Sequence, residues 1–217
     1  MSTRSFCLSV GFMLTLCSVA TFAQDKGPYL GAGVGQSKAK NFGGPSSCPK
    51  LPGVTVTSCS VLDDTDTGWK VFGGYRVSNA AFEASWVDLG KVKLSESGTV
   101  SAIPVIDSAE AHAYGASFDA VFSLPISSDF SLSARAGLFH WTVTATVTRT
   151  SGAAQGFSED RKLTGTGLDF GVGARYDFAE NAGIRIEFQR FAGVGVEGTT
   201  GKADVDLISA SLIYRFR

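Results

Sequence analysis

The sequence predicts an all-β protein, specifically an eight-stranded antiparallel up-and-down transmembrane β-barrel with short periplasmic turns and long extracellular loops. Three observations predict this fold class. Apolar and polar residues alternate over segments of about ten residues, as in strands with two different faces. Beyond residue 23 no apolar run approaches the roughly 18 residues that a transmembrane helix needs. The segments between strands are alternately short and long, which is typical of outer-membrane barrels.

Residues 1–23 have the features of a secretory signal peptide. One early positive charge precedes a mostly apolar stretch, Phe6–Cys17, and small residues then allow cleavage after Ala23 or after Ala20. A retained membrane anchor is the alternative, but the apolar stretch is too short to span a bilayer comfortably. We expect residues 24–217 to form one exported barrel domain.

Eight segments of the chain carry the alternating pattern. In "AYGASFDAVFSL", for example, Tyr114, Phe118 and Phe122 share one face while Ser117 and Asp119 share the other. The short connectors are "SNA", "PISSD" and "AEN", all rich in turn-forming residues. The predicted strands span roughly residues 28–36, 67–77, 81–90, 111–124, 130–144, 164–178, 183–191 and 204–217.

The glycines of the first predicted strand have a positional use. In "YLGAGVGQS", Gly31, Gly33 and Gly35 alternate with larger residues. A dinucleotide-binding loop would need a helix opening on the glycines and an acidic residue about twenty positions later, whereas a long loop follows here. We interpret these glycines, with Gly167, Gly171 and Gly173 of the sixth strand, as space on the inner face for larger side chains.

Aromatic residues distinguish a membrane barrel from a soluble one. A soluble eight-stranded barrel would also alternate, with apolar side chains inside and charges outside. Here the apolar faces end in aromatic side chains beside the short turns, as in the interfacial girdle of a membrane barrel. We therefore expect the apolar face to contact outer-membrane lipid and lipopolysaccharide. The predicted girdle consists of Tyr75, Phe82, Phe122, Phe130, Tyr176, Phe178, Tyr214 and Phe216.

The polar face carries charges of both signs, and a lumen of eight strands is just wide enough for side chains to fill it. Two hairpin registers, centred near residues 127 and 181, set opposite charges directly across strands: Asp119 against Arg135, Asp177 against Arg185, and Arg175 against Glu187. Charges removed from water must pair, so we expect a filled interior. The predicted interior network consists of Lys70, Arg76, Glu83, Asp119, Arg135, Asp169, Arg175, Asp177, Arg185, Glu187 and Arg215.

Two cysteines, Cys48 and Cys59, lie in the first long connector. An exported chain meets an oxidising compartment, so we predict a disulfide between them, which would contribute roughly 2–3 kcal/mol. Two free thiols are the alternative, and a metal site is less favoured because no histidine is near. The second long connector contains "TVSAIPVID", whose Ile103, Val105 and Ile106 either extend the hairpin beyond the membrane or form a binding patch.

Four stretches resemble the transmembrane domain of the outer-membrane protein A (OmpA-like) family. They are "YLGAGVGQS", "FGGYRVSNAAFEASWVDLG", "GVGARYDFAENAGIRIEFQRF" and the closing "YRFR". The resemblance covers the barrel domain only, and it places the protein in the cell outer membrane of a Gram-negative bacterium. It also implies periplasmic chaperones and the barrel-assembly machinery as partners during biogenesis, the latter through the penultimate Phe216.

The same resemblance implies a buried charge network that includes Glu83, Arg135, Arg185 and Glu187. The network differs from the family pattern, because Val121 stands where the family has an inward lysine. Proposals about how charge rearrangement opens a pore in that family therefore cannot be applied to this chain.

Few residues suggest catalysis. His112 and His140 are expected on the outer face, as near neighbours at the loop end, and "FHWT" lacks the His-x-Ser pattern of lipid-modifying barrels. We predict no enzyme activity, no catalytic residue, no metal and no cofactor. The near-zero net charge of −1 gives no reason to expect nucleic acid.

The sequence thus favours a monomeric cell-envelope barrel whose loops present a surface to an extracellular or host ligand. A lipid A-modifying enzyme and a small, porin-like, low-conductance pore are the alternatives. Mass spectrometry of lipid A and planar-bilayer recording would distinguish them.

Overall fold

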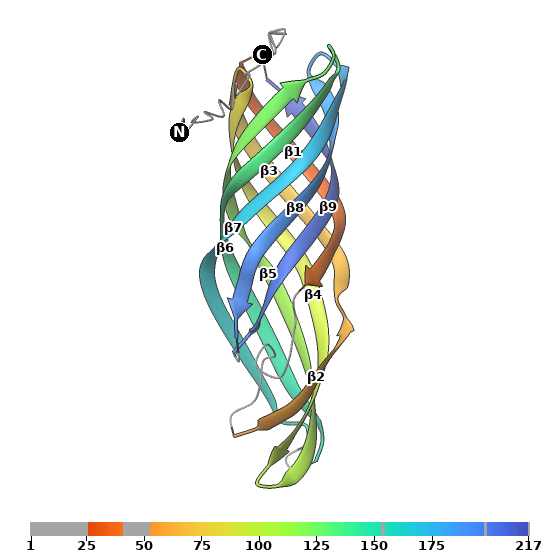
Figure 1. Cartoon of the computed structure of the whole chain (residues 1–217), viewed down its shortest axis with the longest axis vertical. Helices are drawn as coiled ribbons and strands as arrows, with labels where there is room; N and C mark the ends of the chain where they lie inside the picture. Colours follow the sequence, from red (N-terminus) through yellow and green to blue (C-terminus); the bar gives the residue numbers. More distant parts are fainter. Residues whose placement is uncertain (1–25, 41–52, 153–154, 198, 217) are drawn as a thin grey trace, which may run out of the picture.

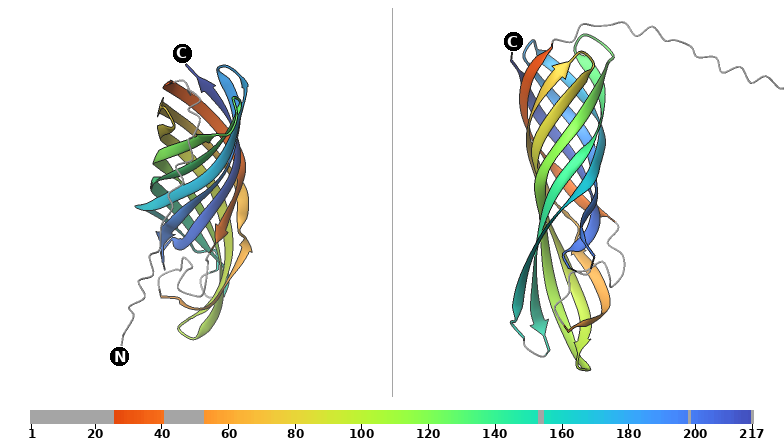
Figure 2. Two further views of the ribbon diagram at one scale, coloured as in Figure 1. Left: turned by 45° about the horizontal axis from the view of Figure 1, so that its top comes forward. Right: turned by 90° about the vertical axis from the view of Figure 1, so that its left-hand side faces the viewer.

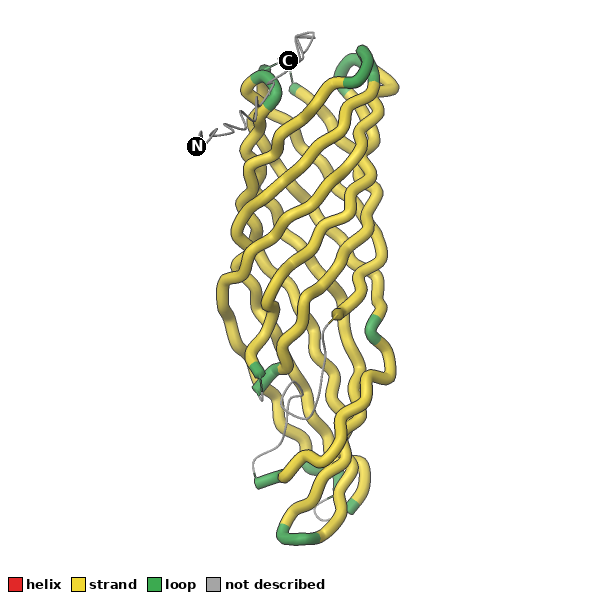
Figure 3. The backbone as a smooth tube through the Cα atoms, in the orientation of Figure 1, coloured by secondary structure: helices red, strands yellow, loops and turns green. Residues whose placement is uncertain are grey.

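Nine strands account for almost all of the residues that the computed structural model describes, namely 26–40, 53–152, 155–197 and 199–216, and these residues contain no helix (Figure 3). The predicted signal peptide and Cys48 lie outside the described residues. The strands are β1 (Gly27–Lys40), β2 (Thr55–Asp63), β3 (Thr65–Val77), β4 (Ala80–Val100), β5 (Ile103–Pro125), β6 (Phe130–Ser151), β7 (Ser158–Ala179), β8 (Ala182–Val196) and β9 (Gly201–Arg215).

Eight of these strands close into a ring, which confirms the predicted fold class. Their order is β4-β3-β1-β9-β8-β7-β6-β5, and pairing of β5 with β4 completes the circle. Every pairing is antiparallel. The strands wind steeply around a tall barrel, with the β3–β4, β5–β6 and β7–β8 turns at one end and the β4–β5, β6–β7 and β8–β9 connections at the other (Figure 1). We refer to these as the turn end and the loop end.

Side chains alternate between the inside and the outside of the ring as the sequence pattern predicts. On β1, Leu30 and Val34 are 55% and 58% exposed, while Tyr29 and Ser37 on the other face are buried. A band of exposed Leu, Val, Ile and Phe continues over the other ring strands. Such a continuous apolar surface is too large for a soluble monomer but matches the lipid-facing band of a membrane barrel.

Four strands are longer than predicted and extend well beyond the ring. Residues 91–110 and much of 145–163, which we expected to be loops, belong to β4, β5, β6 and β7. Figure 2 shows the β4–β5 and β6–β7 hairpins projecting at the loop end. The strands continue because Thr and Val, which favour extended backbone, are frequent there. Ile103 and Ile106 thus belong to an extended hairpin, while the predicted first loop contains an additional strand, β2, paired with β4.

Two predicted hairpin registers are wrong by two residues. Asp119 lies opposite Gly137, and Arg135 lies opposite Val121. On the other hairpin, Arg175 faces Arg185. A shift of two residues keeps every side chain on its face, so alternation cannot detect it. At "AEN" the difference arises from a two-residue turn followed by an irregularity between Asp177 and Ala179.

Two irregularities mark the level at which the ring ends. The β4–β5 register shifts between Asp88 and Lys91, and Gly90 there has a φ of 72°. The inserted residue reverses the side-chain alternation, so that Leu94 and Glu96 continue the inner face. The β8–β9 register shifts in the same way between Phe191 and Val194.

The glycines of β1 allow its backbone to lie close to β9. A Cβ atom on Gly35 would collide with the main-chain oxygen of Ile208, and one on Gly33 would collide with Ser211 and with the main-chain oxygen of Ala210. Main-chain atoms of a closed ring cannot move aside easily. At these two positions glycine is required because β9 lies close, whereas the sequence predicted space for larger side chains.

We predict that Gly33→Leu will hinder closure of the barrel, because a large inward side chain would overpack the β1–β9 seam. Overpacking costs about 1–3 kcal/mol in ordinary cores, and here backbone lies in the way. The folded fraction can be measured by heat-modifiable migration on a gel. Val34→Leu, one residue further and facing lipid, is the control and should fold as wild type does. Equal folding of the two variants would contradict the packed interior.

Candidate functional site

The centre of the barrel is organised around the carboxylate of Glu83, which is fully buried. Its Oε1 accepts hydrogen bonds from Tyr29 Oη at 2.7 Å and from Arg185 Nη1 at 2.5 Å. Its Oε2 accepts from Arg135 Nη2 at 2.9 Å and from Arg185 Nη2 at 3.2 Å. Both oxygens are thus held by charge-assisted bonds, which are stronger than neutral ones.

A second buried carboxylate, Glu187, lies among Lys70 and the same two arginines. Lys70 Nζ lies 2.5 Å from its Oε2, Arg135 Nη1 lies 3.1 Å from its Oε1, and Arg185 Nε lies 3.1 Å from its Oε2. Lys70 also donates to Gln189 Oε1 at 3.1 Å. Lys70, almost wholly buried, thus has a carboxylate and an amide oxygen as acceptors.

Arg135 also connects this pair to the acids of neighbouring strands. Its Nη2 lies 2.7 Å from Asp119 Oδ2, which also accepts a hydrogen bond from Ser117 Oγ at 2.8 Å. Asp169, equally buried, lies beside Asp119. One guanidinium therefore bridges three carboxylates in a space with almost no access to water, where an unpaired charge would be very costly.

The sequence-predicted charges divide into this central network and a smaller cluster at the turn end. The cluster contains Arg76, Arg175, Asp177 and Arg215. Arg175 Nε donates to Asp177 Oδ1 at 2.8 Å, and Arg215 Nη2 lies 3.4 Å from Asp177 Oδ2. Asp177 and Arg215 are each 14% exposed at the side chain, whereas Arg76 and Arg175 are buried.

Of the three predicted cross-strand pairs, one is present as an ion pair. Asp119 binds Arg135, although the two residues lie diagonally. The Asp177–Arg185 and Arg175–Glu187 pairs were wrong because of the register error: Arg175 binds Asp177 on its own strand, and Arg185 binds both central glutamates. Sequence reasoning also missed Tyr29 and Gln189, although the alternation places both on inner faces.

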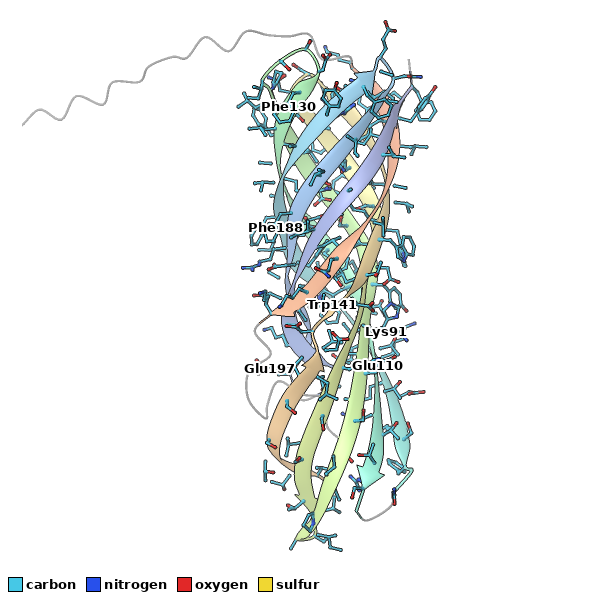
Figure 4. All side chains as sticks on the ribbon, turned by 90° about the vertical axis from the view of Figure 1, so that its right-hand side faces the viewer. Lys91, Glu110, Phe130, Trp141, Phe188 and Glu197 are labelled. Carbon is cyan, nitrogen blue, oxygen red and sulfur yellow. The ribbon has the colours of Figure 1, made fainter. Side chains whose placement is uncertain are left out.

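Between the ionic centre and the loop end, the lumen is apolar. Phe139, Phe191 and Leu207 are fully buried there, and the rings of Phe139 and Phe191 lie 4.7 Å apart. Trp141 is also buried, and Figure 4 shows it at a level between those of Phe188 and Glu197. The apolar layer consists of Val87, Leu89, Ala111, Phe139, Trp141, Val143, Ala145, Phe191, Val194, Val205 and Leu207.

The two histidines lie apart, contrary to the prediction that they are near neighbours. His112 is opposite Thr144, and His140 is opposite Ala116, because the register differs from the one expected. His112 Nε2 lies 3.0 Å from Asp88 Oδ1. Exposed His140 bonds through Nδ1 to the hydroxyl of Thr166 at 3.1 Å. In the described part of the chain, no three His, Cys, Asp or Glu residues gather as a metal site would require.

The predicted girdle aromatics lie on the outer surface at the turn end, with exposed fractions from 38% at Phe130 to 57% at Phe178. Figure 4 shows Phe130 at this level, whereas Lys91 and Glu110 lie toward the opposite end. The latter two form a surface ion pair of 2.8 Å. Aromatic rings at one boundary of the apolar band and charges at the other fit a bilayer between them.

Beyond the ring, β2, β4, β5, β6 and β7 continue as an open sheet, which we call the projecting sheet. On its inner face, Arg149 Nε donates to Asp107 Oδ1 at 2.9 Å, and Leu94, Ala109 and Val147 form a small apolar cluster. Cys59 of β2 is disulfide-bonded. Because Cys48 lies outside the described residues, the Cys48–Cys59 pairing stays a prediction.

The connection between β2 and β3 is held by polar contacts. The hydroxyl of Thr65 donates to Asp64 Oδ1 at 2.9 Å, and Lys38 Nζ lies 3.5 Å from Asp64 Oδ2. The hydrogen bond from Thr65, with the nearby lysine, holds the pKa of Asp64 below its ordinary value. Asp64 is therefore ionised at neutral pH and ties β1 to the base of the projecting sheet.

A ring of eight antiparallel strands, with charges paired inside and an apolar band edged by aromatics outside, defines an integral outer-membrane protein. The chain belongs to the outer membrane protein beta-barrel domain family, whose model matches residues 10–216. The protein is accordingly located in the outer membrane of a Gram-negative bacterium, as predicted. No helix of the described residues has the length and apolar character to span a bilayer.

Several solved structures are similar to this chain. Neisserial surface protein A is 14% identical, with 87% of this chain and 97% of that chain covered and a TM-score of 0.49. The attachment invasion locus protein Ail of Yersinia pestis, in complex with the heparin analogue sucrose octasulfate, is 16% identical, with coverages of 88% and 99% and a TM-score of 0.47. The outer membrane protein OprG of Pseudomonas aeruginosa is 15% identical, with coverages of 88% and 97% and a TM-score of 0.48. No curated protein matches the sequence.

We predict that Glu83→Gln will lower the free energy of unfolding by about 3–5 kcal/mol, because Arg135 and Arg185 would lose the charge that balances them in a buried site. Urea unfolding in detergent, followed by gel migration, measures this. Tyr29→Phe removes only one neutral donor to the same carboxylate and should cost less, about 1.5–3 kcal/mol, as is usual for a hydrogen bond to a charged group. Equal losses in the two variants would show that the charge at Glu83 is unimportant.

Proposed function

We propose that the protein is a non-conducting barrel that contributes to the structure of the cell envelope and presents the projecting sheet to an extracellular or host ligand. The observation that supports this most is the two-layered filling of the lumen. Outer-membrane lipid and lipopolysaccharide would contact its apolar band, and chaperones and the barrel-assembly machinery would handle it during biogenesis.

The two layers leave little room for ion flow. In the turn-side half, long arginine and lysine side chains cross the lumen to carboxylates on distant strands, as between Lys70 of β3 and Glu187 of β8. In the loop-side half, aromatic and aliphatic side chains replace them. Conduction requires sites that an ion can both enter and leave, and neither salt bridges nor an apolar layer provides them.

The projecting sheet supports the binding part of the proposal. It is built on regular strand pairing, so its surface is held more rigidly than a flexible loop would be. Exposed apolar residues lie on it, including Leu62, Ile103 and Ile106. Exposed apolar groups on a surface far from the membrane are suited to contact with another molecule.

We do not extend the proposal to lipid A modification. The hydroxyl of Thr166, which bonds His140, cannot orient and charge-stabilise an imidazole as a carboxylate does in known catalytic arrangements. Asp88 does bond His112 Nε2, at 3.0 and 3.1 Å from its two oxygens, but Tyr114 stands where the His-x-Ser pattern would have a serine. A binding and structural role is the better supported one.

We predict that the folded protein will give no large, stable currents in planar bilayers, because its lumen is occupied over most of its height. Single-channel recording of gel-purified folded material would test this. Small irregular events are compatible with rearrangement of side chains. Large, steady openings from folded protein would contradict the filled lumen.

A second prediction concerns the projecting sheet. Replacing residues 96–107 by Asn-Gly should shorten the β4–β5 hairpin without changing its register, since Ser95 pairs with Ser108 and Asn-Gly favours a two-residue turn. We expect cells expressing this variant to adhere to a host-cell monolayer no better than cells without the protein. Ser127→Asn, in a turn at the opposite end, is the control. Full adhesion by the shortened variant, at equal surface abundance, would count against binding through this hairpin.

A further inference from the structure

Among the described residues, the turn end of the lumen contains more positive than negative charge. Arg76 of β3, Arg175 of β7 and Arg215 of β9 all lie within electrostatic range of one another and of Asp177. Asp177 is the carboxylate that binds two of them, at 2.8 Å and 3.4 Å. Three guanidinium groups thus surround one carboxylate.

The acids of the central network do not correct this excess. Glu83 and Glu187 are engaged by Arg135, Arg185 and Lys70, whose donors occupy their oxygens. Arg185 even stands directly opposite Arg175 on the neighbouring strand. Like charges placed directly across strands repel, so Arg175 faces a cation where an anion would be favourable.

Arg175 carries the clearest sign of a missing partner. Its side chain is 97% buried, and within the described part of the chain both Nη1 and Nη2 are buried without a hydrogen-bond acceptor. Only its Nε is used, by Asp177. Buried donors of a charged group are almost always satisfied. The two Nη atoms therefore indicate a group that brings acceptor oxygens and negative charge.

Two members of the cluster, Arg76 and Arg215, can be reached from the turn end, whereas Arg175, which shares its partner Asp177 with Arg215, lines neither hollow. Arg76 and Arg215 line a narrow cavity of about 10 Å³ together with Lys26 and Phe216, which is enough for about one oxygen-sized atom. A wider, open hollow of about 400 Å³ adjoins it and shares Arg215 and Phe216. Glu180 borders both, so four cations and two carboxylates surround the entrance and the cluster. Because Phe216 belongs to the girdle, this entrance lies at the depth of lipid headgroups.

We propose that the turn end of the barrel binds one phosphate-type oxyanion through Arg76, Arg175 and Arg215, supplied either as free phosphate or as the headgroup of an anionic phospholipid. One oxygen enters the narrow cavity toward Arg76 and Arg215, with Arg175 contributing from beside their shared neighbour Asp177, and the remainder of the group occupies the wider hollow. Arginine suits this role because its planar donors match the oxygens of a phosphate. This site is independent of the projecting sheet and of the function proposed for it.

The test uses the folded mature protein in zwitterionic detergent, titrated with inorganic phosphate by calorimetry at constant ionic strength. Arg175→Gln should weaken binding by about tenfold or more, the usual loss for a charge-assisted hydrogen bond. Asp177→Asn removes the competing carboxylate and should strengthen binding several-fold. Arg190→Gln is the matched control, because Arg190 is paired with Asp206 on the outer face, and it should bind as wild type does.

A second arm distinguishes the two sources of the anion. Thermal unfolding is compared in nanodiscs of phosphatidylcholine alone and of phosphatidylcholine with phosphatidylglycerol. Phosphate binding in detergent supports a free anion as ligand. Stabilisation that requires phosphatidylglycerol, and that Asp177→Asn increases, supports a lipid headgroup.

The two opposite variants keep the proposal falsifiable even if Arg175→Gln folds poorly. A purely structural cluster predicts that Asp177→Asn destabilises the barrel and gains no affinity. The proposal is overturned if neither phosphate nor phosphatidylglycerol has an effect, or if any effect is the same in wild type, Asp177→Asn and Arg190→Gln.

Discussion

The structure depends on one constraint, which is that every charge inside a narrow, water-poor lumen needs a partner of opposite sign. Eight strands leave a lumen that side chains can fill, so charged groups there lose their water and must find each other. Arg135 illustrates the consequence. From β6 it reaches Glu83 on β4, Asp119 on β5 and Glu187 on β8. Strands that share no backbone hydrogen bonds are thereby fastened together across the barrel, in addition to the ladder that runs around it.

The same constraint explains the small residues on neighbouring strands. Long cationic side chains can cross the lumen only where other positions give up volume, and the inner face of β1 does so with Gly31, Gly33 and Gly35. On β9 the facing positions are Ser209 and Ser211, also small and buried. The small residues of β1 and β9 thus let these two strands lie close together and leave the lumen to the longer side chains of the other strands.

The sequence predicts which face each residue occupies, but it does not determine which residue each one meets. Alternation alone placed Glu83, Arg135 and Glu187 inside, because a strand between lipid and lumen tolerates nothing else. Register escaped prediction because a shift of two residues preserves the faces. The ion-pair partners could not be predicted because long side chains reach past their immediate neighbours. Lys70 and Glu187, for example, are not on adjacent strands.

The ends of the strands on the loop side are harder still to predict. Alternation over segments of about ten residues predicts strand ends near residues 90 and 144, whereas outside the bilayer a strand needs no lipid-facing apolar side. Backbone pairing continues along Thr- and Ser-rich sequence for as long as a neighbour is available. Gly90 is a usable signal, since an isolated glycine within a strand pattern often marks a bulge. Its effect on the inner face becomes visible only when Leu94 and Glu96 are seen on the same side as Val87.

The change from closed ring to open sheet also changes how strand edges are protected. Within the membrane, closure removes every edge, which a bilayer demands because it offers no hydrogen bonds to unpaired backbone. Strand β7 pairs with β8 only from Leu168 onward. Among the described residues, the part of β7 before Leu168, beyond the ring at the loop end, therefore has a neighbour on one side alone, β6. That segment carries Glu159, Asp160, Arg161 and Lys162 in succession. Charges on an exposed edge discourage pairing with another chain, and Arg161 and Glu159 bind each other there at 3.0 Å. Charge therefore acts in opposite ways in the two parts of the molecule: inside the ring it joins strands, and at this edge it keeps foreign strands away.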